Sequence, residues 1–359
     1  GARFASEIKI DGDSYWVAAD QYLIQYDLKT NQKLKSVSIQ GIRRFDFYKN
    51  MIVVSRGEYL TKLNSNIIVL DKNTLASIHE VPYNDIPYTT ENIIIKNDIA
   101  YIAVNNGFEW GKEVGQIVEL NLKTFAINKI IDLGANAKNP ENLVLYNEKL
   151  YTVNNKNYTG SSISAIDLKA NTVSTVDLPG ISSLCGTSAL VEDAILYQES
   201  GKSLLGKYST NAQTAGVYKD ASINFYGMTY DPKSQLLVAS ETDFVNKGIV
   251  YAFDKLDNVV YKFDASVSPG NFEFDYSVST ATKDLENIVV AVTPNPANNI
   301  LILNTEKEWS ELNIINAFGQ KIPVTTTDRQ INISQLAQGI YIITGKTNSE
   351  IFQTQFAKQ

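Results

Sequence analysis

Few side chains in this sequence could perform covalent or metal chemistry. His79 is the only histidine and Cys185 the only cysteine, which excludes a zinc site with two histidines and any intramolecular disulfide. His79 lies in a segment typical of an outer strand and Cys185 near the start of an inner strand, so we expect both to be structural. Carboxylates are plentiful, but no spacing shows which of them converge. We therefore predict no catalytic residue, no metal site and no cofactor.

Large aromatic residues on expected loops point to binding rather than catalysis. Trp110 stands between Gly107 and Gly111, where packing explains a tryptophan less well than it does for Trp16 in mid-strand. Aromatic rings beside Asn and Lys are typical of binding surfaces. The alternative is that these rings pack over the strand ends and close a central channel. The predicted ligand-binding residues are Arg56, Tyr59, Tyr88, Phe108, Trp110, Lys112, Tyr158, Tyr226 and Phe244.

A repeat of about 45 residues organises most of the chain. In the four clearest copies a short apolar strand ends on an acidic or amide residue before a Lys- or Thr-containing turn, and two weaker copies follow. Two strands precede this segment and another follows it. The copies lie at 23–30, 67–74, 117–124, 163–169, 204–209 and 249–255. Four short strands per unit predict an all-β fold, a β-propeller over residues 1–277. Six blades are favoured. Seven are the alternative, because residues 270–275 resemble residues 41–46 and would supply the first strand of another blade. A β-sandwich with coincidental spacing is the competing fold.

Two segments of the repeat carry a finer pattern. Residues 101–105 read Tyr-Ile-Ala-Val-Asn and residues 151–154 read Tyr-Thr-Val-Asn. This pattern resembles the strands of YncE-like, quinoprotein-like propellers. Proteins of that kind at bacterial surfaces include corrinoid-capturing ones, so the resemblance implies that a small nutrient is one candidate ligand. The acids at the strand ends are predicted to be turn-forming and not metal-binding.

A second all-β domain is predicted over residues 288–359, after a polar linker at 278–287. Strands are expected at 288–292, 300–304, 312–316, 330–333, 340–345 and 351–356. Many short strands separated by turns predict a small immunoglobulin-like β-sandwich.

Motifs in this second domain carry a more specific resemblance. Two prolines flank Asn295, Gly319 follows the third expected strand, and a Leu-Ala-Gln-Gly-Ile-Tyr run occupies residues 336–341. In this order the motifs resemble the type A sorting domain (Por secretion tail) of the type IX secretion system of Bacteroidetes. A departure is Ala357, where the family often has a bulkier apolar residue. The residues assigned to the sorting signal are Pro294, Asn295, Pro296, Gly319, Leu336, Gly339, Tyr341 and Lys358.

The resemblance implies a route and a set of partners. The protein would cross the inner membrane by Sec export with a cleaved signal, then engage the type IX translocon and its outer-membrane shuttle barrel. A surface sortase would remove the tag between about residues 277 and 287, which places the protein outside the cell or on its outer surface.

Composition narrows the function classes. Lys plus Arg number 32 and Asp plus Glu 39, a net charge of −7 that opposes nucleic-acid binding. No apolar run approaches the ~20 residues of a transmembrane helix. We expect a non-catalytic propeller that binds a small molecule, glycan or protein. A gliding or adhesion-associated surface protein is the second hypothesis. A secreted hydrolase or lyase, using carboxylates or calcium, is the third.

Overall fold

The computed structural model describes residues 5–59, 61–156, 160–178, 187–199, 201–276, 286–309, 311–347 and 350–359. The described residues form strands, turns and connecting segments, and none of them lies in a helix long and apolar enough to cross a membrane. The chain divides into two compact units, Gly1–Asp275 and Tyr276–Gln359.

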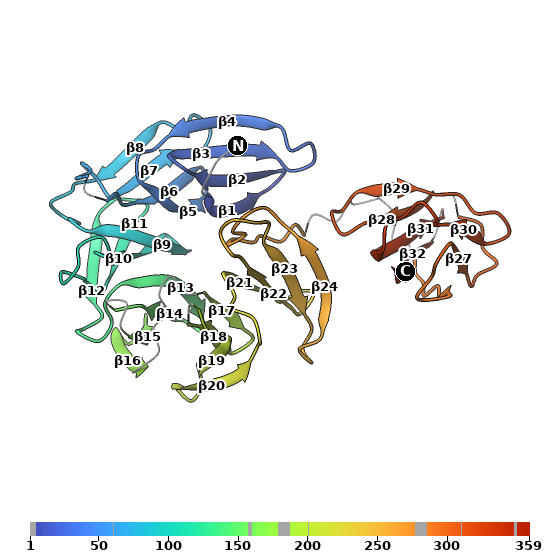
Figure 1. Ribbon diagram of the computed structural model, residues 1–359. Coiled ribbons are helices and arrows are strands. Elements are labelled where there is room, and N and C mark those ends of the chain that lie inside the picture. Colours follow the sequence, from blue (N-terminus) through green and yellow to red (C-terminus); the bar gives the residue numbers. More distant parts are fainter. Residues whose placement is uncertain are drawn as a thin grey trace. The chain divides into compact units, whose positions relative to one another are not determined.

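The first unit is a β-propeller of six blades, each a four-stranded antiparallel sheet whose strands follow one another in sequence. Figure 1 shows the blades from blue to orange around a common centre, with the first strand of each blade innermost. The predicted propeller and its favoured blade number are thus confirmed among the described residues. Residues 270–275, the expected start of a seventh blade, form no strand.

The strand bounds follow the repeat. Blade one holds β1 (Ala5–Asp11), β2 (Ser14–Ala19), β3 (Tyr22–Asp27) and β4 (Lys33–Ser38), and blade two β5 (Ile42–Tyr48), β6 (Met51–Arg56), β7 (Ile67–Asp71) and β8 (Ser77–Val81). Blade three holds β9 (Thr89–Lys96), β10 (Ile99–Asn105), β11 (Gln116–Asn121) and β12 (Ile127–Asp132), and blade four β13 (Pro140–Tyr146), β14 (Lys149–Asn154), β15 (Ser161–Asp167) and β16 (Thr172–Leu178). Blade five holds β17 (Ser188–Val191), β18 (Ala194–Gln198), β19 (Leu204–Ser209) and β20 (Thr214–Asp220), and blade six β21 (Gly227–Asp231), β22 (Leu236–Glu241), β23 (Ile249–Phe253) and β24 (Val259–Asp264).

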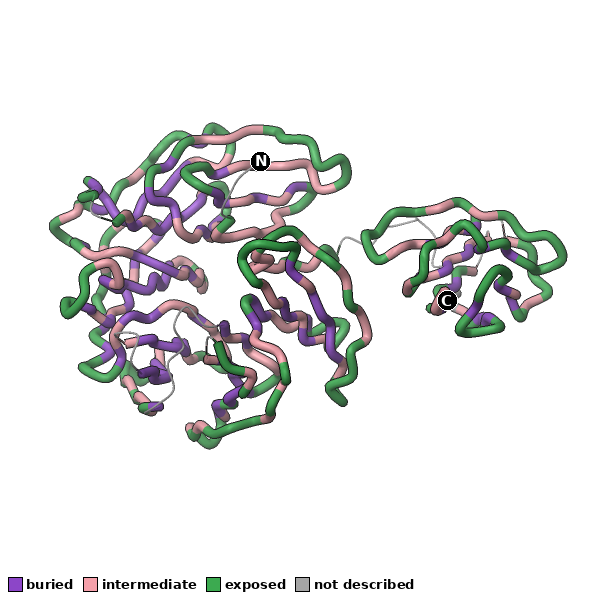
Figure 2. Tube along the Cα trace, viewed as in Figure 1, coloured by how far each residue is buried: buried purple, intermediate pink, exposed green. Residues whose placement is uncertain are grey.

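The apolar core lies between neighbouring blades. Val53 and Ile67 of blade two pack in one buried cluster with Ile102 and Val118 of blade three, and similar clusters join the next pairs of blades. Figure 2 shows burial concentrated on the middle strands and exposure on the fourth strands. Burying one such side chain is worth roughly 1.5–3 kcal/mol. Each blade is therefore stabilised by its neighbours.

An aspartate or asparagine at the end of the third strand closes the turn into the fourth. The Asp71 carboxylate accepts bonds from the backbone N–H groups of Asn73 (2.9 Å) and Thr74 (2.8 Å) and from the Thr74 hydroxyl (3.0 Å). Asp27 and Asp167 accept equivalent backbone bonds. The bonds that Asp71 accepts, first those from Thr74 and then that from Asn73, lower the pKa of its carboxyl group. The predicted turn-forming role of these acids is confirmed.

The second unit packs two sheets face to face. A five-stranded sheet has the order β25 (Glu286–Asn287), β32 (Glu350–Lys358), β31 (Gly339–Lys346), β28 (Glu311–Ile315) and β29 (Lys321–Pro323). A three-stranded sheet has the order β26 (Val292–Thr293), β27 (Ile300–Leu303) and β30 (Gln330–Asn332). Leu301, Ile314, Ile343, Phe352 and Phe356 are buried in one core cluster. This is the β-sandwich that the sequence predicts.

The expected strand at 288–292 is wrong for most of its length. Only Val292 belongs to a strand, and Val289 is 98% exposed, whereas Val290 and Val292 are buried. An alternating apolar pattern is also satisfied by an irregular segment that buries every second side chain. The short edge strand β29 was not predicted, because three residues are too few to show alternation.

The turn caps generate the first prediction. Asp71→Ala removes the acceptor for three bonds, so the melting temperature of the propeller should fall by a few degrees at pH 7 in a thermal-unfolding scan. Because the pKa of Asp71 is lowered in the fold, the difference in melting temperature between wild type and Asp71→Ala should vanish as acid protonates this carboxyl. Asp85→Ala, on another exposed loop, is the control, and equal melting temperatures for both variants would refute the capping role.

Candidate functional site

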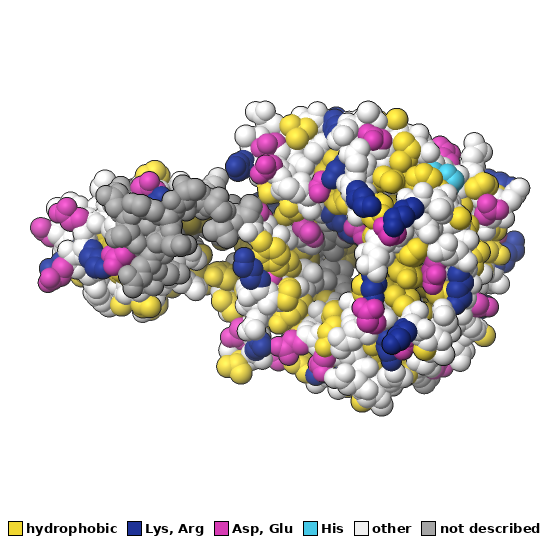
Figure 3. Space-filling model, turned by 180° about the vertical axis from the view of Figure 1, so that it is seen from behind, with side chains coloured by type: hydrophobic (Ala, Val, Ile, Leu, Met, Phe, Trp, Pro, Cys, Tyr) yellow, Lys and Arg dark blue, Asp and Glu magenta, His cyan; other side chains and the backbone are white. Residues whose placement is uncertain are grey.

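The loops between the second and third strands share one face of the propeller with the loops between blades. Gly57, after β6, donates its backbone N–H to the Gly41 carbonyl before β5 (2.8 Å), and Asn139, before β13, donates to Val114 before β11 (2.7 Å). On the face that Figure 3 shows, acidic and basic side chains are interspersed without one dominant sign. Two polar cavities open in this region, one over blades two and three and one at the centre.

The first cavity is a groove of about 480 Å³ over blades two and three, which we call the aromatic groove. The Phe108 ring meets the edge of Tyr59 (6.1 Å between centroids), and Lys62 Nζ lies 4.0 Å from the centroid of Tyr83. The groove thus combines aromatic rings with amide, hydroxyl and charged groups. Its lining residues are Glu58, Thr61, Lys62, Leu63, Asn66, Tyr83, Pro87, Thr89, Asn106, Phe108 and Glu109.

The predicted binding residues near this groove occupy different positions. Phe108 lines it, and Tyr59, 59% exposed, contacts Phe108 from outside the lining. Trp110 is 70% exposed and does not line the groove. Lys112 pairs with Glu109 at 3.0 Å, on the groove rim.

Arg56 and Tyr88 support the groove. The Arg56 guanidinium donates to the Ser65 carbonyl (2.9 Å), and its Nε donates to the Gln40 carbonyl (2.9 Å), so it holds the loop that carries Asn66. Tyr88 packs against the core cluster between blades two and three.

The remaining predicted residues lie elsewhere. Tyr226 and Phe244 meet edge to face (5.4 Å), and Tyr226 lines the central cavity. Tyr158 falls outside the described residues. The structure therefore divides the predicted set between the aromatic groove and the central cavity.

The central cavity, about 510 Å³, is the mouth of the propeller channel. The innermost strand of every blade lines it, together with the segment after blade six. These residues are Glu7, Arg43, Arg44, Glu91, Asn92, Glu141, Asn142, Leu143, Val144, Thr187, Ser188, Tyr226, Met228, Thr229, Gly270, Asn271 and Phe272. We call this site the channel mouth.

Two arginines of β5 organise the channel mouth. Arg43 forms an ion pair with Glu91, and its guanidinium lies 5.2 Å from the centroid of the Phe108 ring. Arg44 lies 3.8 Å from Glu7 and donates to the Asn271 side chain (2.9 Å). Arg43 thus connects the channel mouth to the aromatic groove. Arg44 ties the first two blades to the segment that closes the ring.

Glu141 is the most perturbed carboxyl at the channel mouth. Burial, and then repulsion by Glu91, raise its pKa to about 8, while Arg43, Arg44 and a hydrogen bond from Asn155 oppose the shift. Burial also raises the pKa of Glu7. These residues are not among those predicted from the sequence, although a charged residue recurs near the start of β1, β5, β9 and β13. Alignment of the repeat copies could have revealed that recurrence.

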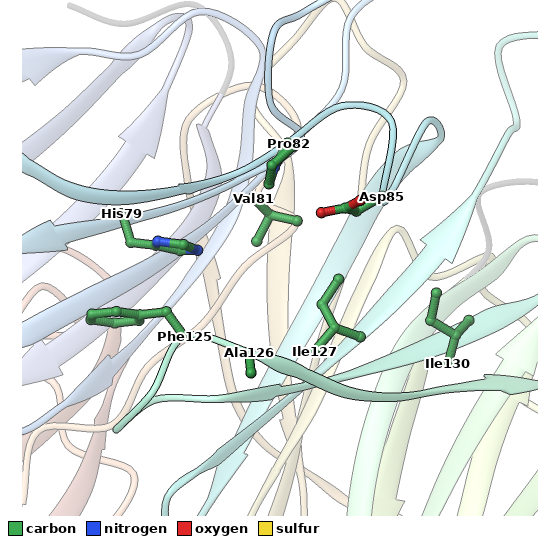
Figure 4. Close-up of a pocket in the computed structure, with 8 residues that line it drawn as sticks. All are labelled: His79, Val81, Pro82, Asp85, Phe125, Ala126, Ile127 and Ile130. Carbon is green, nitrogen blue, oxygen red and sulfur yellow. The ribbon is translucent and has the colours of Figure 1, made fainter.

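A third groove lies along the outer strands of blades two and three and carries the only histidine. The rings of His79 and Phe125 stack at 4.8 Å with an interplanar angle of 9°, beside Val81 and Ile127 (Figure 4). Flat stacking on an apolar ring agrees with the expected structural role of His79. Among the described residues, no group of three or more His, Cys, Asp or Glu side chains could hold a metal.

The predicted sorting residues fix the fold of the second unit. Asn295 accepts a bond from the Ala357 backbone N–H (2.9 Å) and donates to the Gln355 carbonyl (3.2 Å), so the segment between the two prolines is fastened to β32. Tyr341 stacks on Phe356 (5.7 Å) and donates to the Ala337 carbonyl (2.9 Å).

The other sorting residues lie in turns and at strand ends. Gly319 has a φ of +75° in the turn between β28 and β29, and Leu336 packs on the core. Gly339 begins β31, and Lys358 ends β32.

Comparison with known proteins supports this division into two units. Residues 291–359 match the secretion system C-terminal sorting domain. The chain therefore carries a type IX sorting domain and is exported to the cell surface or the extracellular space. This confirms the predicted sorting domain and destination. No protein of curated function matches the sequence.

Solved structures similar to the chain show the fold alone. The extracellular domain of the BT4673 hybrid two-component system from B. thetaiotaomicron is 14% identical with a TM-score of 0.53. The match covers 99% of this chain and 50% of that one, so the chain spans half its length. The WD40 domain of Neurospora crassa Pan2 is 8% identical with a TM-score of 0.53, over 74% of this chain and 79% of that one.

The raised pKa of Glu141 generates a stability prediction. The folded state retains a proton that the unfolded chain releases near pH 4.5, so stability should fall as the pH rises from 4.5 through about 8. Glu141→Gln cannot ionise. Its melting temperature relative to wild type should therefore increase between pH 6 and pH 9. Glu192→Gln, on a paired and exposed carboxylate, is the control, and parallel pH profiles for wild type and Glu141→Gln would contradict the shift.

The sorting domain generates a prediction on export. Deletion of residues 346–359 removes β32 with Phe352 and Phe356, so the second unit should unfold and the protein should accumulate inside a host with a type IX system. Protease accessibility on whole cells measures surface display. Phe318→Ala, an exposed position in the same unit, should be displayed normally. Undiminished display of the truncated chain would oppose the assignment.

Proposed function

We propose that the protein is a non-catalytic, exported binding protein of the YncE-like group, and that its propeller holds an extracellular glycan in the aromatic groove. The observation that carries the proposal is the position of Phe108 in an open groove of about 480 Å³ beside amide and charged side chains. Glycan rings offer apolar C–H faces and a rim of hydroxyls. The groove offers apolar rings and a rim of donors and acceptors.

The groove chemistry suits a sugar ring. Phe108 and Tyr83 supply apolar faces for stacking on C–H groups. Lys62, Glu58 and Glu109 supply the donor and acceptors that hydroxyls need. A few polar groups around an apolar platform are typical of small-molecule sites.

The groove walls are held in place before a ligand arrives. Thr90 donates its hydroxyl to the Asn66 carbonyl (2.6 Å), and the Asn66 side chain donates to the Ile86 carbonyl (3.0 Å). The Asn106 side chain donates to the Lys112 carbonyl (3.0 Å), which fixes the loop that carries Phe108. A preformed site reduces the entropy cost of binding.

The non-catalytic part of the proposal rests on the residues near the groove. The single histidine stacks on Phe125 in a different groove, and Lys112 neutralises Glu109 at the rim. Catalysis by an acid and a base would need two carboxyls poised for proton transfer beside the bound ring, and of the two carboxyls in the groove, Glu58 and Glu109, the second is held by Lys112.

The partners in export are also part of the proposal. The sorting domain implies contact with the type IX secretion machinery. We propose that its contacts include the translocon, the outer-membrane shuttle barrel and a surface sortase.

Phe108→Ala tests the glycan site. Loss of the stacking platform should weaken binding of array-selected glycans about tenfold or more in a titration, in line with the ~1–3 kcal/mol of a lost aromatic contact. Trp110→Ala changes an exposed ring of the same loop outside the groove and should bind within about twofold of wild type.

A larger loss of glycan affinity in Trp110→Ala than in Phe108→Ala would place the ligand on Trp110 and reject the aromatic groove as the binding site. No glycan binding by the wild-type protein on a broad array would reject the ligand class. Unchanged unfolding temperatures for both variants are the control for folding.

A further inference from the structure

The channel mouth holds more acidic than basic side chains. Three glutamates and two arginines line it, and the arginines pair with Glu91 and Glu7. Glu141 has no ion-pair partner among the described residues. We propose that the channel mouth is a second binding site, for a small organic cation with a primary ammonium group, and that Glu141 is the carboxylate that receives it.

A second observation beside Glu141 points to the same ligand chemistry. Asn155 is fully buried and donates its side-chain N–H to the Glu141 carboxylate. Its Oδ1 atom is buried without a hydrogen-bond partner among the described residues. Asn155 does not itself line the cavity, so a ligand there meets the Glu141 carboxylate. Asn155 donates only one bond to that carboxylate, and an ammonium group, with three donors, can fill its remaining acceptor positions.

The size of the cavity limits the ligand. A volume of about 510 Å³ lies within the range of small-molecule sites and suits a short chain or a single ring. The walls come from the innermost strands of all six blades, so the site is rigid. Phe272 and Tyr226 add apolar surface that can cover the hydrocarbon part of such a ligand.

Charge favours a cation over an anion at this site. An anion would face Glu7, Glu91 and Glu141, while Arg43 and Arg44 are already engaged with two of these carboxylates. When Glu141 is ionised, the five side chains carry one net negative charge, which an ammonium group offsets.

Binding should depend on pH because the receiving carboxyl must ionise. The charged groups that face Glu141 are Glu91 on β9, Arg43 and Arg44 on β5, and Glu7 on β1. The pKa of Glu141 is about 8, whereas an alkylammonium stays charged up to pH ~10. Affinity should therefore rise with pH from 6 to 9. Binding at pH 7 should release a proton from Glu141 to the buffer.

Three probes of equal length test the proposal on the full chain. 1,4-Diaminobutane, 1,4-butanediol and succinate are titrated by calorimetry at pH 6, 7.5 and 9. The diamine should bind preferentially, with an affinity that rises about tenfold or more across this range. Proton release at pH 7.5 should appear as a dependence of the heat on the buffer. Preferential binding of succinate, or no discrimination among the three probes, would overturn the proposal without the need for any variant.

Matched variants then locate the cation. Glu141→Gln should lose about tenfold or more in diamine affinity at pH 9 and lose the pH dependence. Glu192→Gln, at an exposed carboxylate paired with Lys255, should match wild type. Equal affinities for Glu141→Gln and wild type would contradict the assignment. The glycan titration and the diamine titration use separate ligands and separate variants, so failure of the glycan proposal and failure of this one are distinguishable.

Discussion

Six four-stranded sheets can bury their faces only against one another, and this constraint determines the rest of the propeller. Ile67 of blade two and Ile102 of blade three are fully buried because their blades share one apolar cluster. Stacking in a ring leaves the first strand of every blade facing the centre. Side chains far apart in the sequence, such as Glu7 and Glu141, therefore meet around one cavity. The ring also gathers the loops between the second and third strands, and those between blades, on a single face.

The two candidate sites follow from different parts of this arrangement. The aromatic groove is built from loops, whose residues are free to vary without loss of the blade cores. The channel mouth is built from the inner strands, where charged groups must be paired or solvated because they are crowded. Arg43 belongs to both, since it pairs with Glu91 in the channel and lies over the Phe108 ring of the groove. The two sites therefore share one guanidinium.

Much of the fold could be predicted from the sequence, and less of the site. The turn from Asp71 to Thr74 and its copies reveal the repeat, because the same local bonds recur in each blade. The sorting motifs are equally local. By contrast, the meeting of Glu91 with Glu141 depends on how blades stack, which no local pattern encodes. Phe108 and Trp110 lie two residues apart, and the sequence favours Trp110 as the binding ring, yet only Phe108 lines the groove. Their difference arises from the path of one loop.

We infer that this exported propeller binds its ligands on one face, where the innermost strands begin and where the loops between second and third strands lie. The most direct test is a crystal structure of the full chain. The protein is recovered from the medium of a secreting culture and crystallised above pH 8 with diaminobutane and an array-selected glycan. The account predicts ordered ligand density over Phe108 and beside the Glu141 carboxylate. Solvent alone at both positions, or ligand bound in the groove beside His79, would contradict it.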